Sequence, residues 1–100
     1  MFHLEGVKIK WILPGRITLG IDDLIGKHEL ADRLKSDVAA VDGVKQIKVD
    51  AGSGTVTLRY DRKRIAKPDS VTALLAALRR HFPDRDFRSI EDWARGSEDN

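Results

Sequence analysis

The run from Arg16 to Tyr60 constrains the fold more than any other part of the sequence. It begins with alternating apolar and polar residues over 16–21, the period of two that is typical of a β-strand with one buried face. Apolar residues then recur three or four positions apart over 30–41, which predicts an amphipathic helix. Two further alternating segments, 44–50 and 55–61, flank a short glycine-rich turn and predict a hairpin. The run therefore predicts the order strand, helix, strand, strand.

A second helix is predicted after Pro68, a residue that suits the first helical turn, and it ends before Pro83. Its apolar residues follow the clearest helical period in the chain and are Val71, Leu74, Leu75, Leu78 and Phe82. This order of elements is that of an α+β ferredoxin-like sandwich, βαββα(β), with an antiparallel sheet and two helices on one face. The other face is expected to carry Arg16, Thr18, Gln46, Lys48, Thr57 and Arg59.

The ends of the chain are less regular. Residues 7–13 alternate like a strand, and Pro14 then marks a bulge, a bend or a sheet edge. After Pro83 the sequence fits either a short final strand over 86–90 or a short helix over 89–95, and both readings stay open. Composition divides the chain into an N-terminal strand or arm (1–13), a domain (14–90) and an acidic tail expected to be disordered (91–100).

Composition excludes several classes of function. The chain has 100 residues and no cysteine, so it has neither disulfides nor thiolate chemistry. No apolar run approaches the roughly 18 residues that a membrane-spanning helix needs. The first residues lack the basic and apolar regions of a leader, so we expect a cytoplasmic protein that does not insert into membranes.

Three stretches of the chain resemble heavy-metal-associated domains. They are Pro14-Gly15-Arg16-Ile17-Thr18-Leu19, Val41-Asp42-Gly43-Val44 and Val56-x-Leu58-x-Tyr60-Asp61. The resemblance covers about Pro14 to Phe82 and is strongest to the cysteine-poor branch found with metal-transporting P-type ATPases. It implies a link to metal homeostasis. In that family a Gly-Met-x-Cys-x-x-Cys loop before the first helix binds soft metal ions, and the two cysteine positions fall here on Lys27 and Leu30. A thiolate-bound metal is therefore excluded.

Two histidines are candidates for a metal or haem site without cysteine. His28 lies at the start of the first helix, and His81 lies at the end of the second. In the predicted topology both lie at the same end of the sandwich, where Glu29 or Asp32 could add a carboxylate. Such a set could bind a divalent metal, namely zinc, nickel or iron, and a single histidine could bind haem. The alternative is that His28 is a solvated residue and that His81 only interacts with the helix dipole.

The apolar residues at the two ends suggest contact with a partner. Val7, Ile9, Trp11 and Leu13 are expected on one face of the first strand, and Trp93 lies near the C-terminus. An apolar strand without a partner tends to aggregate, so it is expected to be covered. The cover is a partner protein, a second copy in a homo-oligomer, or the C-terminal segment with Phe87, Ile90 and Trp93.

The sequence therefore favours a small, non-catalytic module of metal homeostasis that acts by self-association or by docking on a metal transporter or storage protein. The alternative is a carrier that binds a metal or haem through His28 and His81. We recognise no nucleophile paired with a base, so an enzyme is not expected. Nucleic-acid binding is a remote alternative, because the outer sheet face is basic but is expected to lack the aromatic residues that stack on bases.

Overall fold

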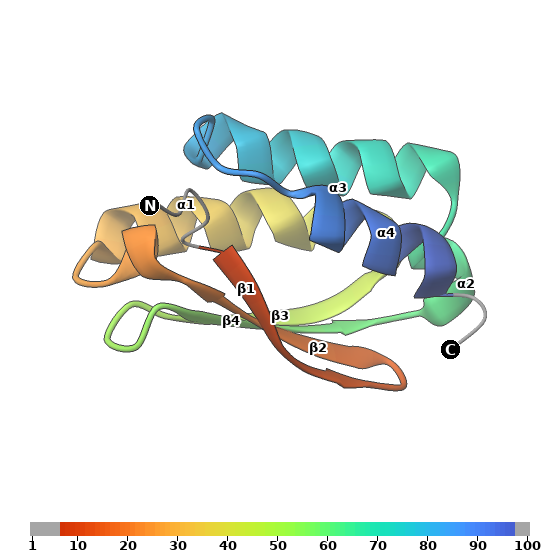
Figure 1. The fold of residues 1–100 in the computed structure, drawn as a ribbon, viewed down its shortest axis with the longest axis horizontal. Helices are drawn as coiled ribbons and strands as arrows, with labels where there is room; N and C mark the ends of the chain where they lie inside the picture. Colours follow the sequence, from red (N-terminus) through yellow and green to blue (C-terminus); the bar gives the residue numbers. More distant parts are fainter. Residues whose placement is uncertain (1–6, 98–100) are drawn as a thin grey trace, which may run out of the picture.

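The computed structural model of the chain describes residues 7–97 and consists of a four-stranded antiparallel sheet with its long helices on one face (Figure 1). The strands are β1 (Val7–Leu13), β2 (Arg16–Ile21), β3 (Val44–Asp50) and β4 (Thr55–Tyr60). The helices are η1 (Asp22–Leu24), α1 (His28–Ala39), α2 (Arg62–Ile65), α3 (Pro68–His81) and α4 (Arg88–Gly96). The predicted α+β sandwich of the ferredoxin-like type is confirmed.

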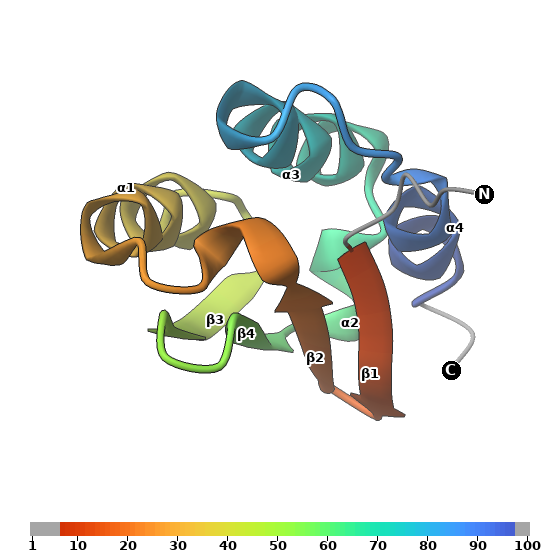
Figure 2. The same ribbon diagram turned by 60° about the vertical axis from the view of Figure 1, so that its left-hand side comes forward.

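The fourth strand of the sheet comes from the N-terminal side of the chain. The strand order is β1-β2-β4-β3, and β1 forms a hairpin with β2 through the turn at Pro14 and Gly15. After Pro83 the chain forms α4, which decides between the two readings that the sequence left open. Figure 2 shows β1 at the edge of the sheet with α4 beside it.

The inner face of the sheet and the apolar faces of the helices form one core. Ile17, Ile21 and Leu58 are buried on the sheet side. All five apolar residues that define the period of α3 are buried, as predicted, and Leu34 and Val38 of α1 are buried beside them. The hydrophobic patterns of β2, β4 and α3 therefore predicted the core correctly.

A β-bulge in β1 changes which of its side chains face the helices. Ile9 pairs with Leu19, but the next pair joins Trp11 to Thr18, so Lys10 is an extra residue in the strand. Paired residues of an antiparallel sheet share a face. Trp11 therefore lies with Thr18 on the outer face, the face of the sheet that points away from the helices.

The bulge corrects the prediction that Val7, Ile9, Trp11 and Leu13 share one face. Val7 and Ile9 point towards the core, whereas Trp11 and Leu13 lie beyond the bulge and point to the outer face. The exposed fractions agree, with 69% for Trp11 and 50% for Leu13. The apolar run from Trp11 to Leu13 is the signal in the sequence that strict alternation fails here.

Helix α4 packs on the chain and covers the region beside β1. Ile90, Trp93 and Ala94 are buried, and Trp93 packs edge-on against Tyr60 with ring centroids 5.0 Å apart. The Trp93 indole N–H donates to the Tyr60 hydroxyl at 3.4 Å, and that hydroxyl donates to the Leu13 carbonyl at 3.4 Å. Residues 91–96, assigned from composition to an acidic tail, are therefore part of a packed helix, because their apolar residues recur at helical spacing.

Candidate functional site

The loop between β2 and α1 occupies the place where the resemblance puts a metal-binding loop. Leu24 is buried and anchors the loop, and Gly26 takes a φ of 79°. At the two positions that correspond to the family's cysteines, Lys27 is exposed and Leu30 packs partly buried against the core. An ammonium group and an alkyl side chain cannot coordinate a soft metal ion, so this loop lacks the chemistry of a thiolate site.

His28 is exposed at the first residue of α1. Its charge acts on Asp50, the last residue of β3. The pKa of Asp50 is lowered mainly because it accepts a hydrogen bond from the Gly52 N–H, next because of the Ser53 hydroxyl, and to a smaller extent by the charge of His28. His28 therefore lies near the β3–β4 turn.

His81 is held by a carboxylate of the opposite helix. Its Nε2 lies 2.6 Å from Asp37 Oδ2, and 10% of its side chain is exposed. The Arg80 guanidinium reaches the same oxygen at 3.2 Å. The hydrogen bond with His81 is the largest of several effects that lower the pKa of Asp37. This cluster joins α1 to α3. The carboxylate beside His81 is therefore neither of the two that the sequence suggested, Glu29 and Asp32, and Glu29 instead lies 3.7 Å from Arg33.

The two histidines do not meet in a common hollow. The hollow beside His81 has a volume of about 400 Å³, and Asp23, Lys27 and Arg85 also line it, whereas His28 does not. Arg85 donates to both oxygens of Asp23, at 2.7 and 2.8 Å, and this pairing is the main cause of the lowered pKa of Asp23. Both oxygens of Asp23 are therefore already paired with the Arg85 guanidinium and are not free to coordinate a metal.

No group of three or more His, Asp or Glu side chains within residues 7–97 is arranged to hold a metal ion. Together with the absence of cysteine from the whole sequence, this means that the residues in the described part of the chain do not fit a heavy-metal site.

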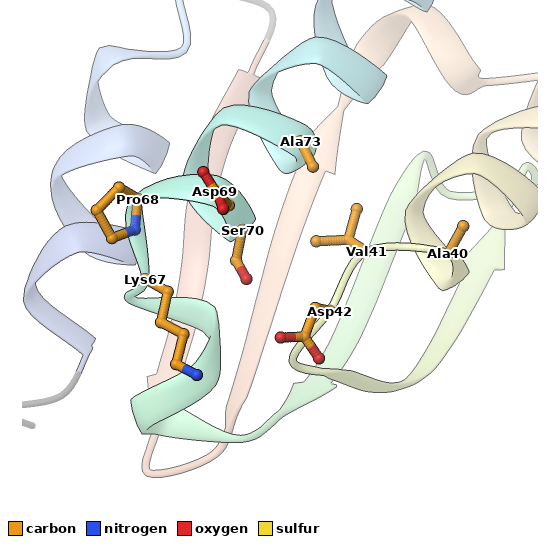
Figure 3. Close-up of a pocket in the computed structure, with 8 residues that line it drawn as sticks. All are labelled: Ala40, Val41, Asp42, Lys67, Pro68, Asp69, Ser70 and Ala73. Atoms are coloured by element: carbon orange, nitrogen blue, oxygen red, sulfur yellow. The ribbon is translucent and has the colours of Figure 1, made fainter.

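A hollow with a volume of about 620 Å³ lies between the end of α1 and the start of α3 (Figure 3). Ser70 is buried in the first turn of α3, and Val41 and Asp42 face it from the turn after α1. Lys67 adds an ammonium group and Asp69 a second carboxylate. This hollow contains none of the site residues predicted from the sequence.

The predicted interaction residues divide into a buried and an exposed group. Val7 and Trp93 are buried inside the molecule, and Ile9 is partly buried against the core. Trp11 and Leu13 are exposed at the end of the hairpin, together with Ile12 between them, which is 48% exposed. Only the exposed group is available to a partner.

Residues 2–79 match the sequence model of a family described as heavy metal associated domain 2. The chain belongs to this family. The match includes β1 and ends within α3, so α4 lies outside the part that defines the heavy metal associated domain 2 family. It confirms the resemblance seen in the sequence, and the lack of cysteine agrees with a cysteine-lacking branch.

No curated protein and no solved structure matches the chain. Family membership makes this a small metal-associated module of a kind usually not catalytic. Among the helices of residues 7–97, none combines the length and apolar character needed to cross a membrane.

Proposed function

We propose that this chain is a non-catalytic docking module of metal homeostasis that acts by contact with a protein rather than by carrying a thiolate-bound metal. The observation that supports the proposal is the hairpin tip, defined here as Trp11, Ile12 and Leu13. Residues 7–97 expose four large hydrophobic side chains, and three of them are these consecutive residues. A cluster of this kind on a small domain is typical of an interaction site.

We propose that the partner is a second copy of the chain. The alternative is that the tip binds a metal transporter or storage protein. The outer faces of two copies are both basic and repel each other, which disfavours contact between two sheet faces. Contact at the tips avoids this repulsion and removes apolar area from water on both copies. The tip lies at the edge strand of the sheet, where a twofold arrangement can bring two tips together.

Sedimentation measurements over a range of protein concentrations test this proposal. Wild type is expected to dimerise, and Ile12→Ser is expected to weaken the dimer about 10- to 100-fold, because two half-exposed isoleucines lose their burial. Ile25→Ser is the matched control, since Ile25 is 52% exposed but lies in the loop after η1, at the other end of β2. A monomer at every concentration, or an equal effect of the two variants, would overturn docking between copies at the tip.

A metal titration tests the alternative carrier function. Zinc, nickel, iron and haemin are added to the wild type and to His28→Ala, with calorimetry and absorbance as readouts. We expect no binding tighter than roughly 100 µM, which corresponds to about −5.5 kcal/mol. Stoichiometric binding that disappears in His28→Ala or His81→Ala would instead establish a cysteine-free metal or haem carrier.

A further inference from the structure

The outer face of the sheet is left uncovered by the helices. α1, α3 and α4 all lie on the opposite side of the sheet (Figures 1 and 2). Four strands about 4.8 Å apart give a face roughly 15 Å wide, which two to three nucleotides of an extended chain can cross.

Basic side chains cross this face from edge to edge. The pairing register places Lys8 opposite Gly20, Arg16 opposite Arg59 and Lys48 opposite Thr57. Lys10 extends over Gly20, so closely that a Cβ at residue 20 would lie 2.8 Å from the Lys10 Cε. The cations of the outer face are Lys8, Lys10, Arg16, Lys45, Lys48 and Arg59, and all six are exposed.

The second bulge of the sheet adds to this charge. Val44 pairs with Tyr60 and Gln46 with Arg59, so Lys45 is an extra residue of β3. It lines a shallow hollow together with Arg16 and Arg59. Each bulge therefore places one additional lysine on the outer side of its strand.

Five of these cations show no interaction with an acidic residue within residues 7–97, whereas the charge of Lys45 helps to lower the pKa of Asp61. None of the six takes part in the ion pairs found there. The one acidic residue that the strands place on this face is Asp50, whose carboxylate accepts from the Gly52 N–H and the Ser53 hydroxyl of its own turn. The chain has a net charge of only +2, so this face concentrates positive charge.

Trp11 supplies the aromatic surface that the sequence did not predict for this face. The bulge at Lys10 turns its indole to the outer side, beside Thr18 and in line with Thr57. The two threonine hydroxyls lie 3.3 Å apart across β2 and β4. An exposed indole can stack on an unpaired base, and the surrounding cations can contact phosphates.

We propose that the outer face binds single-stranded nucleic acid, with Trp11 stacking on one base and Arg16, Arg59 and Lys48 contacting the backbone. The positive charge that crosses this face from edge to edge matches a phosphate backbone. A duplex fits less well, because its bases are stacked on each other and are not available to the indole. This inference does not require docking at the hairpin tip, but Trp11 belongs to both sites, so a docked tip and a stacked base compete for its indole.

Fluorescence anisotropy with labelled single-stranded RNA and DNA of about 12 nucleotides tests the proposal. Binding is expected to weaken with salt, with a slope of about −0.7 in log K against log salt for each phosphate contact. Trp11→Ala should weaken binding about tenfold or more, as expected for the loss of one stacked base. Arg16→Ala with Arg59→Ala should weaken it and make the salt slope shallower.

Matched controls test whether binding depends on the cations of this face or on positive charge anywhere on the surface. Arg33→Ala with Lys35→Ala removes two exposed cations from α1 and should leave the affinity unchanged. The fluorescence of Trp11 should be quenched on binding, and in Trp11→Ala the remaining emission of the buried Trp93 should not respond. Ile12→Ser, whose side chain points away from the outer face, should bind nucleic acid at least as tightly as the wild type, because loss of the dimer leaves Trp11 free to stack.

Three results would overturn the proposal. The first is no measurable binding at about 50 mM salt, where phosphate contacts are strongest. The second is equal loss of affinity in the α1 control and the outer-face variants. The third is equally tight binding of polyglutamate, which would assign the face to an acidic protein segment instead.

Discussion

Gly43 shows how a single residue joins two elements of the sandwich. It follows α1 with a φ of 100°, and its carbonyl accepts a hydrogen bond from the Asp61 N–H at 2.8 Å. A Cβ at this position would lie 2.7 Å from the backbone nitrogen of Ile65. The end of α2 therefore occupies the space that a side chain at residue 43 would need.

Gly43→Ala is expected to destabilise the fold more than Gly26→Ala. Both glycines have positive φ, so each substitution costs about 1–2 kcal/mol of backbone strain. A Cβ at Gly26 has no atom within 4 Å, whereas the one at Gly43 meets backbone that cannot move aside cheaply. Urea denaturation of both variants measures their free energies of unfolding. Equal values would show that close packing against α2 does not matter at residue 43.

At the scale of elements, α4 decides whether β1 is covered. The strand carries apolar residues on both sides. The Tyr60 hydroxyl donates to the Leu13 carbonyl of β1 and accepts from the Trp93 indole N–H, so it links the strand to α4. The Ser97 hydroxyl donates to the Trp93 carbonyl at 2.8 Å and closes the last turn. α4 therefore completes the core of the sandwich, although it lies beyond the part that matches the family.

Trp93→Ala is expected to lower the free energy of unfolding by about 3–5 kcal/mol, the usual cost of removing a large buried aromatic residue. Arg95→Ala, on the exposed side of the same helix, is the control and should change it by about 0.5 kcal/mol or less. Arg95 forms only a surface pair with Glu91, at 2.7 Å. Urea denaturation followed by near-ultraviolet circular dichroism measures both, and a small effect of Trp93→Ala would show that α4 is dispensable.

At the scale of the whole molecule, several carboxylates have a lowered pKa, and two of them, Asp23 and Asp37, join distant parts of the chain. Arg85 lowers the pKa of Asp23, and His81 lowers that of Asp37. The amide groups at the start of α2 lower the pKa of Asp61. The side chain of Arg88 lowers the pKa of Asp86 to about 2. In each case the folded state binds the proton less tightly than the unfolded chain does.

Acid is therefore expected to destabilise the protein. The contribution of these carboxylates is fully present above the unfolded pKa of about 3.9, and it is lost as the pH falls through the lower pKa values of the folded state. Urea denaturation at several values between about pH 5 and about pH 2 measures the loss. Asp23→Asn should make the pH dependence shallower, whereas Asp32→Asn on the exposed side of α1 should leave it unchanged. An identical slope for both variants would rule out the Asp23–Arg85 pair as a source of the dependence.

The elements whose pattern is local could be predicted from the sequence alone. The alternation over Arg16–Ile21, the helical period of α3 and the turn at Gly43 each follow from spacing within one segment, so the sandwich and its core could be predicted. The family could be recognised for the same reason, because its motifs lie in those segments. The absence of cysteine alone excluded a thiolate site.

The roles of the two ends of the chain, in contrast, depend on tertiary contacts. β1 became the fourth strand because pairing with β2 satisfies its backbone, and the extra Lys10 turned Trp11 outward. The apolar run from Trp11 to Leu13 signals that alternation fails, but it does not show at which residue the bulge lies or which side chains it turns outward. His81 found its partner in Asp37, 44 residues away, rather than in Glu29 or Asp32. Pairing register and contacts between helices depend on residues far apart in the chain, and for that reason local pattern could not predict them.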